Sequence, residues 1–148
     1  MLFRSDLRRA HDTANAITTG QIRLTSEPDL REFNFGEWDG LHFSQISEKD
    51  KALSRAFWEQ PGDTAPPGGE SWNALALRVG RVVDRINANN PETDVIAVAH
   101  FGVILTQLQR GLGTTAYQTL AHRIDPLSVT VLAHEDGRWD VDRINHQP

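Results

Sequence analysis

The sequence contains no cysteine among its 148 residues. This absence excludes disulfide bonds, thiolate nucleophiles and metal sites built on cysteine. No apolar run reaches the roughly 20 residues that a membrane-spanning helix needs. Charge enters at Arg4, too early for a signal peptide. We therefore expect a cytoplasmic protein with no membrane segment.

Basic residues are also in the minority, because 15 Lys and Arg stand against 20 Asp and Glu, for a formal net charge of -5. This balance disfavours a general nucleic-acid-binding surface, so any site for an anion has to be local. Hydrophobic residues make up 39% of the chain and charged residues 24%. Such a composition is typical of one globular domain, which we expect to span residues 1–148.

Apolar residues at helical spacing predict a helix over residues 6–18, with Ser5 as its N-cap and Gly20 as its end. The continuous apolar run Val95–Ala99 is typical of a strand that is buried on both faces of a parallel sheet. Residues 2–3 are expected to end another strand, one that begins upstream of the chain. Helices that alternate with strands in this way indicate an α/β fold with a mixed sheet. The remaining pattern predicts an irregular segment over 21–45, a helix over 47–58, a surface loop over 60–69, a helix from Trp72 to Asn89-Asn90-Pro91 capped by Ser71, a helix ending at Gly113, a strand over 127–133 and a hairpin that turns at Asp136-Gly137.

Two adjacent arginines, Arg8 and Arg9, fall in the first turn of the predicted helix over 6–18. Cations oppose the helix dipole there and the free N–H groups point outward, so the pair is favourable if an anion lies beside it. Two solvated arginines, one of them paired with Asp6 or Asp12, would explain the same residues. Charge placement alone leaves both interpretations open.

His100 ends the predicted strand over 95–99, two residues before Gly102. The crevice at the carboxyl ends of parallel strands is where open α/β sheets bind ligands. A hydrogen-bonded structural histidine is an equally good interpretation of this position. Glu32 falls in a predicted loop, where an acidic side chain is ordinarily solvated surface.

Four stretches of the sequence together resemble a known family. They are Ser5-Asp6-Leu7-Arg8-Arg9-Ala10 with Thr13-Ala14, Leu30-Arg31-Glu32 with Gly36-Glu37-Trp38, Pro67-Gly68-Gly69-Glu70-Ser71, and Val98-Ala99-His100-Phe101-Gly102-Val103. With these motifs in the family's order, the chain resembles the histidine phosphatase superfamily, the phosphoglycerate mutase-like proteins, over nearly its whole length. The resemblance is closest to small phosphatases of the α-ribazole-phosphatase type. It implies a three-layer α/β/α fold with a mostly parallel mixed sheet, and phosphoryl transfer through a phosphohistidine.

The resemblance also implies site residues and a substrate class. Arg9 would grip the phosphoryl group of a small phosphorylated metabolite, and His100 would hold and neutralise its oxygens. Glu32 would protonate the leaving oxygen, which requires a carboxyl group whose pKa is raised by burial or by a nearby anion. Phe101 departs from the glycine that is frequent at this position, so its ring either narrows the pocket or favours an apolar leaving group.

No metal or other cofactor is implied, because cationic side chains take that role in the family. The remaining histidines share no metal-ligand spacing; they are His11, His42, His122, His134 and His146.

One part of the family pattern is missing, since it requires an Arg-His-Gly tripeptide near its start and no such tripeptide occurs in this sequence. The family's first strand and its nucleophilic histidine are therefore expected to be absent, so that the domain is incomplete at its N-terminus. Three interpretations stay open: a truncated active phosphatase, a relative that binds phosphorylated ligands without turnover, and an interaction protein on the same fold. The missing strand also leads us to expect a marginally stable chain, a homo-oligomer formed by strand exchange, or aggregation through Val95–Ala99.

Overall fold

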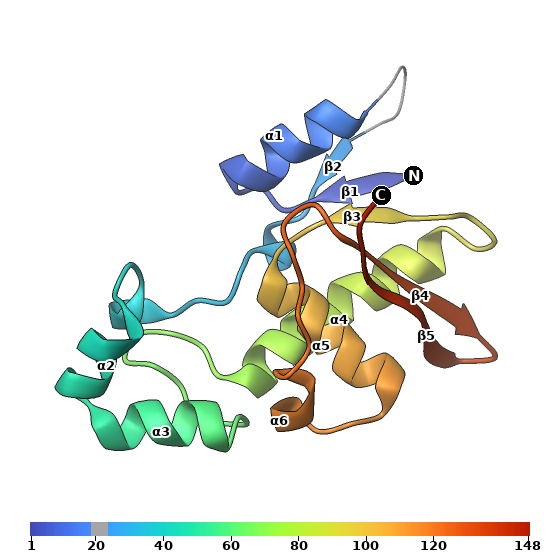
Figure 1. The fold of residues 1–148 in the computed structure, drawn as a ribbon. Coiled ribbons are helices and arrows are strands. Elements are labelled where there is room, and N and C mark those ends of the chain that lie inside the picture. Colours follow the sequence, from blue (N-terminus) through green and yellow to red (C-terminus); the bar gives the residue numbers. More distant parts are fainter. Residues whose placement is uncertain (19–23) are drawn as a thin grey trace.

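The computed structural model describes residues 1–18 and 24–148, and Figure 1 shows their arrangement. In chain order the elements are β1 (Leu2–Arg4), α1 (Arg8–Ile17), β2 (Leu24–Ser26), the 3₁₀ helices η1 (Pro28–Leu30) and η2 (Gly36–Trp38), α2 (Phe43–Lys49), α3 (Lys51–Glu59), α4 (Trp72–Asn89), β3 (Ile96–Val98), α5 (Phe101–Leu112), α6 (Ala116–Thr119), β4 (Val129–Glu135) and β5 (Arg138–His146).

A three-stranded parallel sheet with the order β2-β1-β3 lies between helices (Figure 1). Helix α1 covers one face, and α4 and α5 lie on the other side. The register pairs Arg4 with Ser26 on one neighbour and with Val98 on the other, so the three strands end at the same edge. The predicted α/β fold with helices on both faces of the sheet is confirmed. The loops after β1 and β3 therefore leave the sheet at the same edge and lie close together there.

The core forms where α4 and α5 pack together beneath the sheet. Leu75 and Val79 of α4 and Leu105 and Leu108 of α5 are each 0% exposed, at the spacing that predicted these helices. The indole N–H of Trp72 donates to the side-chain oxygen of Gln109 at 2.6 Å, which links the two helices. Both predicted boundaries of this helix pair hold, because Ser71 caps α4 and Gly113 ends α5 in the left-handed region with φ 60°.

The start of α1 differs from the prediction. Ser5 is buried and donates its N–H to the carbonyl of Val98 at 2.9 Å, so it belongs to the sheet edge rather than to the helix. The N-cap is Leu7, which has no side chain able to cap. The helix therefore spans Arg8–Ile17 instead of 6–18, and Gly20, its predicted end, lies outside the described residues.

Two further predictions were wrong in the segment that follows. Residues 21–45 are not wholly irregular, because the short strand β2 pairs with β1; three residues are too few to show a period in the sequence. The single helix predicted over 47–58 is two helices that meet at Asp50. Asp50 is the C-cap of α2, and its carboxylate accepts the N–H of Leu53 at 3.0 Å to cap α3. Capping by aspartate thus breaks a continuous apolar pattern.

The prediction that Val95–Ala99 is buried on both faces was also wrong. Ile96 is 53% exposed, and within the described residues β3 has only β1 as a hydrogen-bonded neighbour. The predicted final hairpin is confirmed, with Asp136 and Gly137 both at positive φ in its turn, but β4 and β5 form a separate antiparallel sheet. The second edge of β3 is therefore free among the described strands, which explains why its apolar side chains remain exposed.

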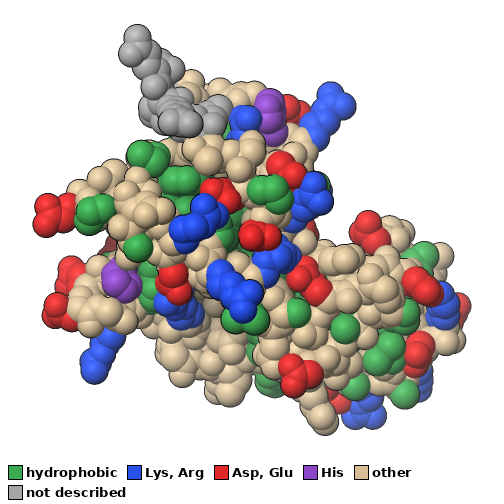
Figure 2. Space-filling view, turned by 180° about the vertical axis from the view of Figure 1, so that it is seen from behind, with side chains coloured by type: hydrophobic (Ala, Val, Ile, Leu, Met, Phe, Trp, Pro, Cys, Tyr) green, Lys and Arg blue, Asp and Glu red, His purple; other side chains and the backbone are tan. Residues whose placement is uncertain are grey.

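Charged side chains of both signs are interspersed over the face drawn in Figure 2, as the net charge leads one to expect. Among the helices of the described residues, none is both long and apolar enough to cross a bilayer.

The free edge of β3 predicts association of the chain with itself. We expect wild-type protein to elute at larger apparent size as its concentration rises, because exposed apolar strand edges pair with one another. Ile96→Lys should weaken this association, since a charged side chain opposes edge-to-edge pairing. Leu77→Lys is the control, because Leu77 is similarly exposed, at 56%, but lies on α4. A wild-type protein that is monomeric at every concentration, or equal effects of the two variants, would contradict the prediction.

Candidate active site

The loops that leave β1 and β3 bring Arg9 and His100 into contact. Arg9 lies in the first turn of α1, and His100 is the N-cap of α5. The guanidinium Nε of Arg9 donates to Nδ1 of His100 at 3.1 Å, although the two residues are 91 positions apart. Parallel strands that end at one edge make this contact possible.

His100 is 6% exposed, and its protonation follows from its surroundings. Because Nδ1 accepts a hydrogen bond, the imidazole is neutral and carries its proton on Nε2. Nε2 is buried and has no partner among the described residues. Burial lowers the pKa of His100 to about 4, helped by the positive charge of Arg9 and opposed by Asp6. The site thus holds a buried N–H donor beside a permanent cation.

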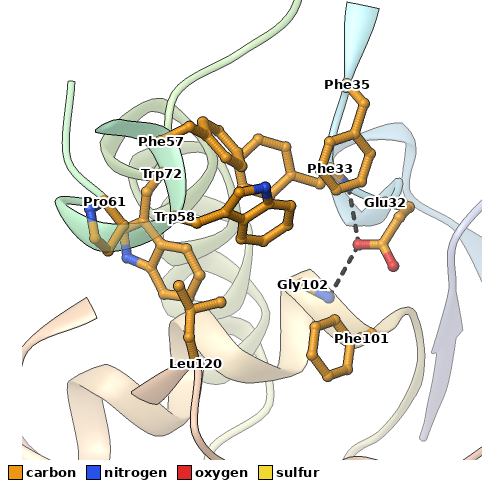
Figure 3. Close-up of a pocket in the computed structure, with 10 residues that line it drawn as sticks. All are labelled: Glu32, Phe33, Phe35, Phe57, Trp58, Pro61, Trp72, Phe101, Gly102 and Leu120. Atoms are coloured by element: carbon orange, nitrogen blue, oxygen red, sulfur yellow. Dashed lines mark hydrogen bonds between the residues drawn. The ribbon is translucent and has the colours of Figure 1, made fainter. Parts of the chain in front are cut away.

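Glu32 is tied to the same turn through backbone hydrogen bonds, drawn as dashed lines in Figure 3. Its Oε1 accepts the N–H of Phe33 at 2.8 Å and the N–H of Gly102 at 3.0 Å. A Cβ at 102 would lie 2.7 Å from this oxygen, so a larger residue there would displace the carboxylate of Glu32. Burial raises the pKa of Glu32, and the two backbone bonds and the charges of Arg9 and Arg78 oppose this rise. A raised pKa is the property that a proton donor needs.

Two ion pairs fix the loop that carries Glu32. Arg31 donates to both carboxylate oxygens of Asp6, at 2.7 and 2.6 Å, which ties this loop to the residues before α1. Arg78 of α4 pairs with Glu70 at 2.6 Å and also donates to the carbonyl of Arg31 at 3.1 Å. Bidentate and shared guanidinium bonds of this kind restrict orientation as well as distance. Arg31, the residue before Glu32, is therefore held through both its side chain and its carbonyl group.

Glu70 gives the segment Pro67–Ser71 a structural role. Its Oε1 accepts the N–H of Asn34, and its own N–H donates to the carbonyl of the same residue, both at 2.9 Å. Trp38 is buried, and Glu37 pairs at the surface with Lys49 at 3.0 Å, so the first serves packing and the second the loop surface.

An apolar cavity of about 50 Å³ lies against Glu32 (Figure 3). Its walls come from the loop after η1, from α3, and from the starts of α4 and α5. The lining residues are Glu32, Phe33, Phe35, Phe57, Trp58, Pro61, Trp72, Phe101, Gly102 and Leu120.

The structure thus brings the three predicted site residues to the N-terminus of α5. Arg9 contacts His100 directly, and Glu32 is joined to the same turn through Gly102. The cavity, however, is lined by Glu32 and by neither Arg9 nor His100. Arg8 lies apart, with its side chain 96% exposed and 3.6 Å from Asp12, so for this arginine the solvated interpretation holds.

Sequence reasoning missed the positioning role of Arg31 and the aromatic cavity. Arg31 stands beside Glu32 in the same motif, but nothing in the sequence names Asp6 as its partner. The alternation of Phe33 and Phe35 next to Glu32 was a signal for an apolar wall. In the described part of the chain, no group of His, Asp and Glu side chains is arranged to hold a metal ion.

Residues 1–147 match the family model of the histidine phosphatase superfamily (branch 1). The chain belongs to this superfamily. A bifunctional protein of Mycobacterium tuberculosis is 33% identical over 143 residues, which cover 95% of this chain and 39% of the relative. The metal-independent phosphoserine phosphatase of Arabidopsis thaliana is 31% identical over 144 residues, which cover 95% of this chain and 59% of the relative. The chain therefore spans less than two thirds of the length of these curated relatives.

The fold of the chain matches solved structures of phosphatases. The structure of a mycobacterial glucosyl-3-phosphoglycerate phosphatase in complex with VO3 superposes with a TM-score of 0.85 at 32% identity, covering 99% of this chain and 76% of that one. The α-ribazole phosphatase of Shigella flexneri superposes with a TM-score of 0.83 at 23% identity, covering 98% and 72%, a likeness of fold. The predicted family and phosphoglycerate mutase-like fold are confirmed.

His100 makes the stability of this chain depend on pH in a defined window. Its pKa is about 4 in the folded chain, against 6.5 for an unperturbed histidine. Between these values the unfolded chain binds a proton at this residue and the folded chain does not, so stability is lost as the pH falls from 6.5 toward 4. We expect the melting temperature of wild type to fall more steeply across this window than that of His100→Gln.

Comparison with the variant is needed because Glu32, with its raised pKa, shifts stability in the opposite direction. Equal slopes of melting temperature against pH for the two proteins would show that His100 is not held neutral by the fold.

Proposed function

We propose that Arg9 and His100 bind the phosphoryl group of a small phosphomonoester, and that Glu32 serves as the acid in its hydrolysis. The observation that carries this proposal is the buried Nε2 of His100, a donor with no partner among the described residues, beside the guanidinium of Arg9. A buried polar atom without a partner costs about 1–3 kcal/mol, so its retention favours a ligand acceptor at this position.

The chemistry of the donors fits a phosphoryl group. A guanidinium presents several N–H groups in a plane that suits phosphate oxygens. The N-terminus of α5, a helix of 12 residues, adds the positive end of the helix dipole, although its Gly102 N–H is already bonded to Glu32. Because His100 is neutral, its Nε2–H donates a hydrogen bond to the anion without adding a second cation beside Arg9.

Glu32 fits the role of acid because both of its backbone hydrogen bonds use Oε1. Within the described residues Oε2 has no hydrogen-bond partner, so it is free to meet a substrate oxygen. Burial raises the pKa of this carboxyl group, and a bound phosphoryl anion would raise it further.

Hydrolysis by the family's route needs a histidine that this sequence lacks. In that route a histidine nitrogen bonds to phosphorus while the ester P–O bond breaks, and Glu32 gives its proton to the leaving oxygen. Water then attacks phosphorus, the P–N bond breaks to release the histidine and inorganic phosphate, and the Glu32 carboxylate takes up the proton that water loses. We propose that the nucleophile comes from outside these 148 residues, and phosphate binding without turnover is the alternative for the chain as it stands. A small phosphorylated metabolite of the cytoplasm remains the predicted substrate class.

Phosphate binding should depend on Arg9 and not on its neighbour. We expect the chain to bind inorganic phosphate and orthovanadate, and Arg9→Ala to weaken binding by about 10–100-fold, because a charge-assisted hydrogen bond is lost. Arg8→Ala is the matched control, since Arg8 is adjacent in sequence and its side chain is 96% exposed. Calorimetric titration measures both variants. Undetectable phosphate binding by wild type, or equal losses in the two variants, would overturn the proposed site.

The chain by itself should release no phosphate from p-nitrophenyl phosphate above background, because its site residues bind and protonate but do not attack phosphorus. The assay compares wild type with His100→Ala. Turnover that disappears in this variant would identify His100 as the nucleophile and contradict the role given to it.

A further inference from the structure

We propose that the cavity beside Glu32 receives the leaving group, and that the substrate is the phosphomonoester of a compact, apolar alcohol, such as a single aromatic ring. This inference rests on the proposed function, because it names the substrate class of the same site. It depends on three features: the position of Phe101, the chemistry of the cavity wall, and the size of the cavity.

Phe101 joins the proposed phosphate site to the cavity. It lies between His100, which contacts Arg9, and Gly102, which donates its N–H to Glu32. The ring of Phe101 lines the cavity and is 45% exposed. Figure 3 shows this ring beside Gly102, facing the same space as Glu32. An ester oxygen that meets Glu32 therefore has the phosphoryl group on the His100 side and its carbon substituent on the aromatic side.

The wall of the cavity is a packed set of rings. Phe33 stacks on Phe35 with ring centroids 4.9 Å apart, and Phe57 meets Phe33 edge to face at 5.5 Å. Trp58 packs edge to face against Phe57 at 4.8 Å. Rings held in this way offer apolar surface with little freedom to move. A substrate ring gains contact there without immobilising the wall.

The same wall disfavours hydroxylated leaving groups. Among the described residues that line the cavity, Glu32 alone is charged, and its Oε1 already accepts two backbone N–H groups. The buried indole N–H of Trp58, which has no partner among the described residues, could meet one substrate hydroxyl. Each further hydroxyl in the cavity would give up its water without a replacement from the aromatic wall, which lowers affinity by about tenfold for each buried group. Sugar and glycerol phosphates are therefore disfavoured.

The size of the cavity limits the apolar group. Its volume of about 50 Å³ is smaller than the roughly 150 Å³ that encloses a benzene molecule in a protein core. A single ring can therefore enter only in part and must rest against the exposed ring of Phe101 at the mouth. Phosphomonoesters with larger, fused rings should therefore bind no more tightly than those with a single ring.

Binding of three probes to the 148-residue chain separates this inference from the proposed function. The probes are inorganic phosphate, phenyl phosphate and glycerol phosphate, each titrated by calorimetry. We expect phenyl phosphate to bind about tenfold or more tightly than glycerol phosphate, because part of its ring leaves water. If phosphate binds but phenyl phosphate binds no better than glycerol phosphate, the inference on the leaving group is overturned alone. If no probe binds, the proposed function fails and this inference fails with it.

Phe101→Ala tests the cavity directly. We expect this variant to bind phenyl phosphate about 3–10-fold more weakly than wild type and inorganic phosphate with unchanged affinity. Phe43→Ala is the matched control, because Phe43 is a comparably exposed phenylalanine, at 59%, that lies at the start of α2 and outside the cavity. Far-ultraviolet circular dichroism and melting confirm that both variants fold. Equal affinities of the two variants for phenyl phosphate would overturn the inference.

Discussion

The hydrogen bond from the backbone N–H of Gly102 to the carboxylate of Glu32 is the constraint on which the site depends. It brings a loop carboxyl group onto the N-terminus of α5, where the helix dipole favours negative charge. The approach is so close that a side chain at 102 would displace the carboxylate. Without this bond the carboxylate of Glu32 would lose its direct link to α5, and its loop would be held by the ion pairs of Arg31 and Arg78.

The shared edge of the parallel strands supplies the other half of the arrangement. Because β1 and β3 end in register, α1 and α5 both begin beside this edge, and Arg9 meets His100 there. The ion pair between Asp6 and Arg31 then ties the loop before α1 to the loop that carries Glu32. Backbone topology thus provides the coarse position of each group, and guanidinium bonds provide the fine position.

Much of the fold and of the candidate site could be predicted from the sequence, and the predictions that were wrong have physical causes. Helices α4 and α5 were predictable because their buried residues repeat at helical spacing and their ends carry Ser71 and Gly113. Strand β2 could not be predicted, because three residues are too few to show the alternation of a strand and because β2 is stabilised by pairing with β1. The apolar run at β3 shows that its side chains are hydrophobic but not which elements cover them, so Ile96 was wrongly predicted to be buried. The aromatic cavity depends on how α3 packs against a distant loop, which no local pattern encodes.

The contact between Arg9 and His100 has a consequence for how the two helices are joined. Arginine only donates, so the bond exists only while Nδ1 of the imidazole keeps its lone pair. One added proton would turn the acceptor into a second donor, and the starts of α1 and α5 would then face each other with like charges. His100 Nδ1 accepts a hydrogen bond from Arg9, and a phosphate oxygen is an acceptor of the same kind. Protonation of His100 and binding of an anion therefore have opposite effects on the contact between the starts of α1 and α5. Protonation makes Arg9 and His100 repel each other, whereas an anion accepts hydrogen bonds from both.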